Sequence, residues 1–226
     1  MENTDIIDPQ LINNNLETSF TGRNLIVFKT IDSTNNFAFT LARQYIASGK
    51  KDEEDKLNGT VIVSDRQTSG RGRFEKKWFS PPGGLWFSII LKPSASLHKI
   101  QNITLLAAAV IAQVFNECYK VDVRIKWPND IYYNHKKLAG ILTESESIAG
   151  RIIIVTGIGL NINNTDFGSD YRAPECAVSL SEILKRPLDR NAILADLLNN
   201  FEKKYSYLIK TGDLKSIFSK IERLVY

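Results

Sequence analysis

The sequence predicts an α+β fold with a mixed, largely antiparallel sheet and helices packed on one side of it. Hydrophobic residues recur with a period of two between residues 121 and 157, and turns interrupt this pattern, as is typical of consecutive antiparallel strands. Residues 103–119 carry a broad apolar stripe, which indicates a central core helix. Most of the sequence after residue 178 also has helical periodicity, so strands and helices are grouped and do not strictly alternate.

The N-terminal half supplies the other predicted strands and one long helix. Three short apolar or β-branched segments are expected to be strands, namely 24–28, 60–64 and 85–91. The polar residues at 32–35 provide a helix N-cap, and an apolar stripe then continues to about residue 47. The charges at 50–56 alternate in sign and indicate a solvated loop.

Residues 1–22 are expected to be a loose N-terminal extension, because they are rich in Asn and acidic side chains and lack a sustained periodicity. Residues 23–226 are then expected to form a single domain. From residue 121 onward, the predicted elements are strands at 121–126, 131–133, 138–144 and 151–157 and helices at 179–184, 191–208 and 214–224.

The composition excludes several classes of protein. The chain has 226 residues, of which 43% are hydrophobic, and 29 Lys and Arg stand against 25 Asp and Glu, which argues against a disordered chain. The longest uncharged stretch, residues 101–116, is too short to span a bilayer, and no apolar signal segment opens the sequence. Two isolated cysteines, Cys118 and Cys176, favour a reducing, cytoplasmic setting.

The motifs of several common enzyme sites are missing from the sequence. His98 and His135 have no partners at zinc-ligand spacing, and neither a lysine-containing phosphate loop nor a serine nucleophile elbow occurs. Residues 157–162 follow a predicted strand, but they lack the third glycine of a dinucleotide-binding fingerprint.

Three other segments could converge on an anionic ligand. Residues 67–78 form a basic, glycine-rich loop whose backbone amides and arginines suit an anion, although a mobile, solvated loop has the same composition. Lys126 is at the end of a predicted strand, beside the turn at 128–130. The alternative interpretation is that it is an ordinary lysine that faces the solvent. Residues 157–163 combine glycines with asparagines, a pattern that also describes a β-bulge and turn.

Six motifs, taken together and in order, closely resemble those of the biotin–protein ligases (holocarboxylase synthetases) over about residues 28–163. They are Ile31-Asp-Ser-Thr-Asn35, Gln67-x-x-Gly-Arg-Gly-Arg73 with Trp78, Leu85-Trp-Phe-Ser88, Lys126-Trp-Pro-Asn-Asp130, Lys137-Leu-Ala-Gly-Ile-Leu142 and Gly157-Ile-Gly-Leu-Asn161. The resemblance implies the class II synthetase-like fold of biotin and lipoate ligases. It implies a catalytic domain without the N-terminal DNA-binding domain of some relatives.

The resemblance also implies a reaction and a set of site residues. The family activates biotin with ATP as biotinyl-5′-AMP and transfers it to a lysine of a biotin carboxyl carrier domain. Lys126, Arg71 and Arg73 would be the catalytic residues, because cations are needed where a carboxylate meets a triphosphate. Residues implied to bind biotin are Ser33, Thr34, Asn35, Gln67, Gly70, Arg71, Gly72, Arg73, Trp86, Lys126, Gly140 and Leu142. Residues implied to bind ATP or the adenylate are Arg71, Trp78, Asn129, Asp130 and Asn161.

No tightly bound metal is expected, and Mg²⁺ would arrive with ATP near Asp130 or Asn161. Two departures from the family pattern bear on these expectations. Glu75 and Lys76 replace a second Gly-Arg pair in the basic loop, which affects how the loop closes. The chain ends about where many relatives continue into a small C-terminal β-domain, so that domain is expected to be absent, either naturally or by truncation.

Three alternatives stay open at this point. A lipoate– or octanoate–protein ligase shares the fold and the adenylation chemistry. A nucleic-acid-binding module would use the basic loop, with Trp78 and Trp127 as stacking platforms. A biotin-binding remnant with weak activity is the third. Neither DNA nor a membrane is an expected partner, and the sequence leaves open whether the chain forms a homodimer.

Overall fold

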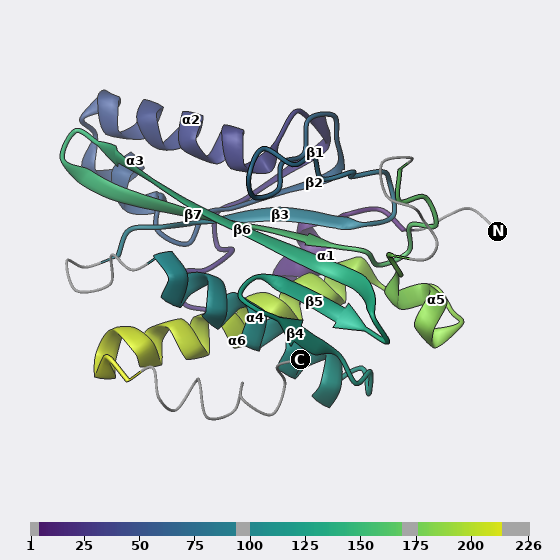
Figure 1. Ribbon diagram of the computed structural model, residues 1–226. Coiled ribbons are helices and arrows are strands. Elements are labelled where there is room, and N and C mark those ends of the chain that lie inside the picture. The colour runs from purple at the N-terminus through teal and green to yellow at the C-terminus, as the bar shows by residue number, and fades with distance from the viewer. Residues whose placement is uncertain (1–4, 94–99, 169–175, 214–226) are drawn as a thin grey trace.

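The computed structural model describes residues 5–93, 100–168 and 176–213, and these residues are built around a seven-stranded sheet (Figure 1). The strands lie in the order β1-β2-β3-β7-β6-β5-β4; β1 and β2 are parallel, and the other neighbours are antiparallel. The strands are β1 (Leu25–Ile31), β2 (Val61–Gln67), β3 (Leu85–Leu91), β4 (Arg124–Lys126), β5 (Asp130–Tyr133), β6 (Lys136–Ile148) and β7 (Arg151–Leu160). The helices are α1 (Pro9–Asn14), α2 (Thr34–Ser48), α3 (Lys51–Lys56), α4 (Ile100–Glu117), α5 (Leu180–Leu184) and α6 (Arg190–Thr211).

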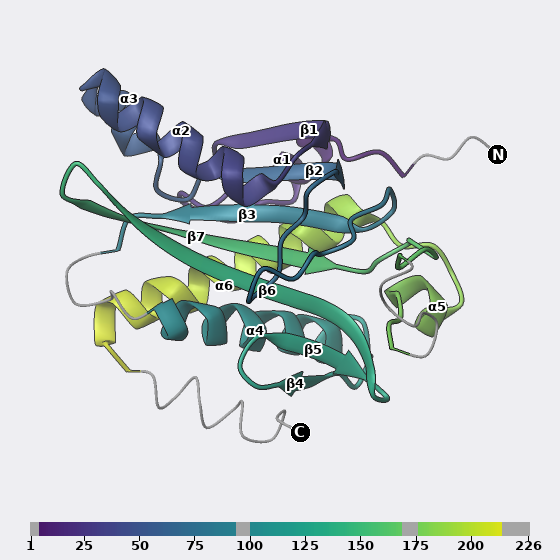
Figure 2. The ribbon, with the colours of Figure 1, turned by 45° about the horizontal axis from the view of Figure 1, so that its top comes forward.

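Helices cover both faces of the sheet. The apolar sides of α1, α4 and α6 join the main core on one face, whereas the stripe of α2 forms a second core on the opposite face (Figure 2). The predicted α+β class and the largely antiparallel sheet are confirmed. The structure corrects the expectation that the helices pack on one side, because an apolar stripe shows that a helix buries a face but not which side of the sheet receives it.

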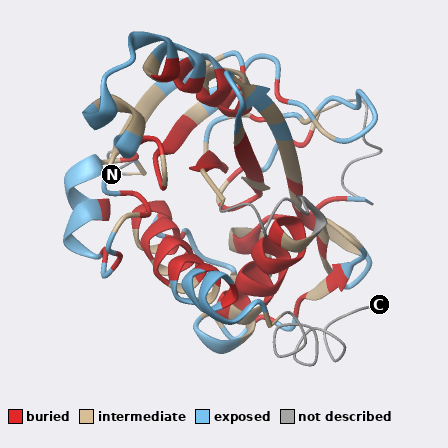
Figure 3. Ribbon diagram, turned by 90° about the vertical axis from the view of Figure 1, so that its left-hand side faces the viewer, coloured by how far each residue is buried: buried red, intermediate tan, exposed pale blue. Residues whose placement is uncertain are grey.

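Strand β3 lies near the middle of the sheet, and all seven of its residues are buried. Phe87 and Ile89 face the core beneath α4 and α6, and Ile90 faces the core beneath α2. Coverage on both sides explains why this strand is apolar at every position except Ser88 and does not alternate with polar residues. The buried residues accordingly gather where helices and strands meet, and exposed residues lie outside (Figure 3).

Helix α4 is the central core helix that the sequence predicts. Residues 103–112 are all buried, because α4 packs between the sheet at β6 and helix α6. The N-cap predicted for α2 is confirmed at Ser33, whose Oγ accepts a hydrogen bond from the backbone N–H of Asn36 at 3.4 Å.

The described part of the predicted loose extension, residues 5–22, is packed against the rest of the chain. Ile7, Ile12 and Leu16 belong to the main core. Asp8 caps the short helix α1 by accepting from Gln10 N at 2.8 Å. The prediction of a loose segment is wrong here, because its polar side chains serve as caps and as partners for residues far along the sequence.

Two smaller differences concern individual elements. Residues 51–56 form the helix α3 where a loop is predicted, and β4 begins at Arg124, later than the predicted residue 121. Val121, Val123 and Ile125 are nevertheless buried and Lys126 is exposed, as the alternation predicts. His98 and the predicted helix at 214–224 lie outside the described residues. Among the helices of the described residues, none combines the length and the apolar character that a membrane crossing requires.

Candidate active site

A cavity of about 340 Å³ opens on the face of the sheet that carries α2. Its walls come from the start of α2, the end of β2, the basic loop, the turn between β4 and β5, and the glycine-containing parts of β6 and β7. The three segments that the sequence places near an anion therefore meet in one cavity.

One wall of the cavity is the indole of Trp78, which lies against two glycines of the sheet. Gly140 in β6 and Gly159 in β7 are direct cross-strand neighbours. A Cβ atom at Gly159 would lie 2.5 Å from the indole Nε1, and one at Gly140 would lie 2.9 Å from Cζ3. Lys137 Nζ lies 5.0 Å from the centre of the indole and 2.9 Å from Asp130 Oδ1. The glycines thus leave room for an aromatic surface on which a flat heterocycle can pack.

Hydrogen-bonded polar side chains at the start of α2 and the end of β2 line another part of the cavity, its polar end. The backbone N–H of Thr34 donates to Gln67 Oε1 at 2.8 Å, and Gln67 Nε2 donates to Ser80 Oγ at 2.9 Å. The hydroxyl of Ser88 lies 2.7 Å from Thr34 Oγ1 and 2.6 Å from Asn35 Oδ1. These contacts orient donors and acceptors from α2 and β2 toward one region of the cavity.

The same polar end is joined to the basic loop through a carboxylate. Asn35 fits beside Gly157, where a Cβ atom would lie 2.3 Å from Asn35 Oδ1. Asn35 Nδ2 donates to Glu144 Oε2 at 2.8 Å. Arg71 donates to both oxygens of Glu144, from Nη1 at 2.9 Å and from Nη2 at 2.7 Å. Glu144 therefore holds a cation of the loop next to a predicted biotin-binding asparagine.

The other two predicted catalytic cations have a different environment. Arg73 Nη1 donates to Asn129 Oδ1 at 3.0 Å, and Asn129 Nδ2 donates to the carbonyl of Ile141 at 3.1 Å. Lys126 Nζ lies 5.0 Å from the centre of the Tyr132 ring. Within the described ranges, neither Arg73 nor Lys126 forms an ion pair with a carboxylate. Both positive charges are thus available to an anionic ligand.

The basic loop is folded back on itself as a narrow hairpin. The N–H of Gly72 donates to the carbonyl of Lys76 at 2.6 Å. At its tip, Phe74 and Glu75 have φ angles of 55° and 58°, in the left-handed region that glycine adopts most easily. Glu75 stands where the biotin-ligase pattern has glycine, so the departure seen in the sequence coincides with a strained backbone position.

Most of the predicted site residues lie together. Those that line the cavity are Ser33, Thr34, Asn35, Gln67, Arg71, Gly72, Arg73, Trp78, Lys126, Asn129, Asp130, Gly140 and Leu142.

Three predicted site residues do not line this cavity. Gly70 lies in the hairpin, where a Cβ atom would be 2.4 Å from the Trp78 carbonyl oxygen. Trp86 is fully buried behind Trp78, in a T-shaped contact with ring centroids 6.3 Å apart. Asn161 is 4% exposed, and its amide Nδ2 donates to the Lys137 carbonyl at 3.4 Å. These residues support the walls of the cavity from outside.

Several residues that line or brace the site were not assigned a role from the sequence, among them Tyr132, Lys137 and Glu144. The sequence contains a signal for Glu144. Gly140, Leu142 and Glu144 are alternate residues of β6, so Glu144 lies on the same side of the strand as the two predicted biotin-binding residues. Lys137 offers no such signal, since its position over Trp78 depends on the fold of the loop.

The comparisons with known proteins agree with this arrangement. The model of the biotin/lipoate A/B protein ligase family matches residues 27–163. The bifunctional ligase/repressor BirA of Bacillus subtilis is 37% identical over 194 residues, covering 84% of this chain and 56% of the relative. Biotin–protein ligase 2 of Arabidopsis thaliana is 31% identical over 221 residues, covering 90% of this chain and 62% of the relative. The chain thus spans less than two thirds of the length of these curated relatives.

The solved structures give the same result for the fold. The biotin protein ligase from Aquifex aeolicus in complex with biotin and ATP superposes with a TM-score of 0.72 at 30% sequence identity, covering 90% of this chain and 78% of that one. Its apo form gives a TM-score of 0.68 at 26% identity. Since the family match includes every strand that lines the cavity and more than half of the sequence, the chain belongs to the biotin/lipoate A/B protein ligase family.

Proposed function

We propose that this chain activates biotin with ATP to form biotinyl-5′-AMP and pyrophosphate, and then transfers the biotinyl group to a lysine of a biotin carboxyl carrier domain. The observation that carries the proposal is that Arg71, Arg73 and Lys126, from two separate segments, line one cavity with a polar end and an aromatic wall. A cavity of this kind suits a ligand with a hydrogen-bonding head, an anionic junction and a flat base.

The cations act where two anions must meet. In the first step, a carboxylate oxygen of biotin attacks the α-phosphorus of ATP, and pyrophosphate leaves. Lys126 and Arg73 lie in the cavity without carboxylate partners among the described residues, so they offset the charge that builds up during this attack. In the second step, the amine of the carrier lysine attacks the acyl carbon, and AMP leaves.

The polar end of the cavity is assigned to the biotin head. Thr34, Asn35 and Gln67 present hydroxyl and amide groups that are already oriented by neighbours, and Ser88 supports them from the sheet. A ureido ring has N–H donors beside a carbonyl acceptor, so it requires both kinds of partner at fixed positions. Preoriented groups reduce the entropy that binding costs.

The aromatic wall is assigned to the nucleotide. Trp78 supplies a surface for adenine, and Asn129 and Asp130 lie on the turn beside it. Asp130 provides a carboxylate on this wall, which suits the Mg²⁺ that accompanies ATP, although Asp130 is here paired with Lys137. Asn161 is less suited, because its amide is buried and hydrogen-bonded away from the cavity. No group of three or more His, Cys, Asp or Glu side chains that could hold a metal ion occurs within the described ranges.

Exchange of labelled pyrophosphate into ATP tests the proposal. Biotin, lipoate and octanoate are supplied in turn to the same preparation of the whole chain. Exchange that depends on biotin supports the proposal, whereas exchange only with lipoate or octanoate would assign the chain to the other branch of the family. Absence of exchange with all three acids would contradict the proposal. Labelling of a carrier domain, the cytoplasmic setting and the absence of DNA binding remain predictions for separate measurements.

A further inference from the structure

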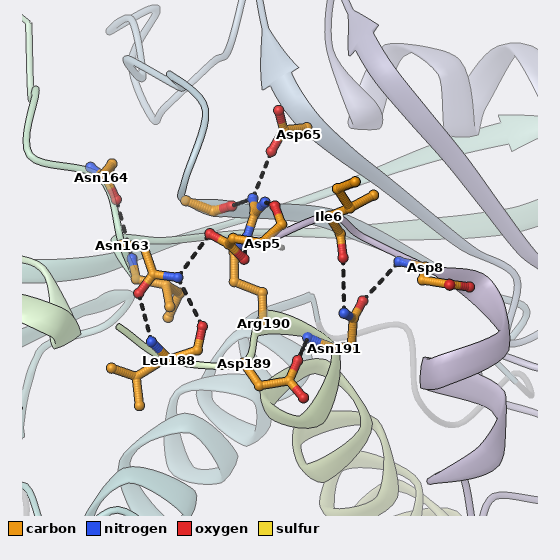
Figure 4. A network of polar contacts seen from close by, with 12 residues as sticks. Asp5, Ile6, Asp8, Asp65, Asn163, Asn164, Leu188, Asp189, Arg190 and Asn191 are labelled. Atoms are coloured by element: carbon orange, nitrogen blue, oxygen red, sulfur yellow. Dashed lines mark hydrogen bonds and ion pairs between the residues drawn. The ribbon is translucent and has the colours of Figure 1, made fainter. Parts of the chain in front are cut away.

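Arg190, the first residue of α6, is 1% exposed and lies outside the cavity. Its guanidinium is surrounded by oxygens from three separate parts of the chain (Figure 4). Nη1 donates to Asp65 Oδ1 at 2.7 Å and to the carbonyl of Gly84 at 2.7 Å, and Nε donates to Asp5 Oδ1 at 2.6 Å. Because the arginine is fully buried and hydrogen-bonded to all three, it fixes the positions of the segments that carry Asp5, Asp65 and Gly84.

Two of these acceptors lie on either side of the basic loop in the sequence. Asp65 lies in β2, two residues before Gln67, and Gly84 immediately precedes β3. All of the loop that carries Arg71, Arg73 and Trp78 lies between them. One nitrogen atom of Arg190 therefore bridges the strand that enters the loop and the turn that leaves it.

The N-terminal segment completes this arrangement. Asp5 binds Arg190 through one carboxylate oxygen, and its other oxygen accepts from Asn163 Nδ2 at 2.8 Å. Asn163 in turn donates its backbone N–H to the carbonyl of Gly83 at 2.7 Å. Asp5 thus supplies a second negative charge to the buried guanidinium and reaches the exit of the loop through Asn163 (Figure 4).

We infer that Arg190 is a positioning residue of the ligase site and that Asp5 makes the N-terminal segment part of its support. Arg190 holds the two sides of the loop at a fixed separation. Gln67 can then accept the hydrogen bond from Thr34, and Trp78 can pack on Gly140 and Gly159. This inference rests on the proposed function, because it is that reaction which requires the loop to be placed accurately. Displacements of about 1 Å in catalytic machinery reduce rates by up to roughly 100-fold.

The test compares variants of the Arg190 clamp, formed by Arg190 with Asp5, Asp65 and Gly84, with a control in α6 that binds a different part of the N-terminal segment. Arg190→Lys keeps the charge but loses the bridging fork, and Asp65→Asn keeps the shape but loses the charge. Glu202→Gln is the control, because Glu202 holds residues 19–21 by hydrogen bonds to their backbone and, among the described residues, forms no hydrogen bond or ion pair with the loop. Pyrophosphate exchange gives kcat and KM for biotin, and amide hydrogen exchange reports on residues 66–84.

We expect both clamp variants to raise the KM for biotin about 10-fold or more, and to speed hydrogen exchange of the loop, without a matching change in Glu202→Gln. Asp5→Asn should show the same changes to a smaller degree. If Arg190→Lys fails to fold, Asp65→Asn decides the result. Equal effects in all variants, or a loss of thermal stability with an unchanged KM, would overturn the inference. Absence of biotin-dependent pyrophosphate exchange in the unmodified chain would instead contradict the proposed function. In that case, amide hydrogen exchange of the loop would still test whether Arg190 holds the loop in place.

Discussion

Arg71 in the basic loop and Glu144 in β6 form a two-point ion pair, with both guanidinium Nη atoms within 2.9 Å of the carboxylate. The same carboxylate accepts from Asn35 at the polar end of the cavity. One side chain therefore sets the position of a predicted catalytic cation relative to the predicted biotin pocket. Its role can be separated from that of ordinary surface charge, because Glu146 forms a similar pair with Arg43 two residues further along β6.

Glu144→Gln should lower kcat/KM for biotin in the exchange assay by about 10-fold or more, since Arg71 then has one neutral acceptor oxygen in place of a carboxylate and faces an amide N–H donor. Glu146→Gln is the matched control and should change exchange little, because exposed pairs contribute only about 0–1 kcal/mol. Equal losses in the two variants would show that general charge, and not the position of Arg71, accounts for the effect.

Gly159→Ala should weaken ATP binding and leave biotin binding intact. The added methyl group would lie within 2.5 Å of the indole Nε1, so Trp78 must leave its place on the sheet. We expect the KM for ATP to rise about 10-fold, whereas the dissociation constant for biotin alone, measured by calorimetry, stays within twofold. An unchanged KM for ATP would remove Trp78 from the nucleotide site.

Glu75→Gly should stabilise the hairpin at the tip of the basic loop. A left-handed conformation costs a non-glycine residue about 1–2 kcal/mol, and part of this is recovered when glycine replaces Glu75. Slower amide hydrogen exchange at residues 72–77 is the expected result. Glu75→Ala separates conformation from charge, because it removes the carboxylate and keeps the Cβ atom; slower exchange in Glu75→Ala as well would assign the effect to charge.

Glu202 should make stability depend on pH in the acidic range. Burial opposes its ionisation, but three backbone N–H donors at residues 19–21 outweigh burial and lower the pKa of Glu202 below its ordinary value of 4.5. A carboxyl with a lowered folded-state pKa stabilises the fold above its unfolded-state pKa, and this contribution is lost as pH falls through the folded-state value.

Chemical denaturation of the Glu202→Gln variant checks this pH dependence. The variant should be less stable than the unmodified chain by about 1.5–3 kcal/mol at pH 7, and the difference should shrink as the pH falls below about 4.5. A difference that is independent of pH would mean that the ionised carboxylate is not what holds residues 19–21.

The sequence predicted those parts of the fold in which local pattern determines the outcome. The alternation in 121–126 correctly separated buried Val123 from exposed Lys126, and the apolar stripe of residues 103–119 identified the core helix. The N-terminal segment was mispredicted because the partners of Asp5 and Thr21 are Arg190 and Glu202, more than 180 residues away. Such a segment looks polar and unstructured until its distant partners are known.

In the candidate site, too, the local motifs were predicted from the sequence and the contacts between distant residues were not. The motifs placed Lys126, Arg73 and Trp78 in one cavity, although each motif had an ordinary alternative. The contact of Glu144 with Arg71 and the support of the loop by Arg190 depend on which strands are neighbours and on how the loop folds back. Neither can be read from spacing along the chain.

Lys126 should be the residue on which adenylation of biotin in this cavity depends most. The most direct test is biotin-dependent exchange of pyrophosphate into ATP, measured side by side for the unmodified chain, Lys126→Ala and the control Lys51→Ala on the exposed helix α3. We predict that Lys126→Ala lowers kcat roughly 100- to 1000-fold while the unfolding temperature is unchanged, because the lysine is exposed, and that Lys51→Ala behaves like the unmodified chain. Exchange within a few-fold of the unmodified chain in Lys126→Ala would show that adenylation does not depend on Lys126.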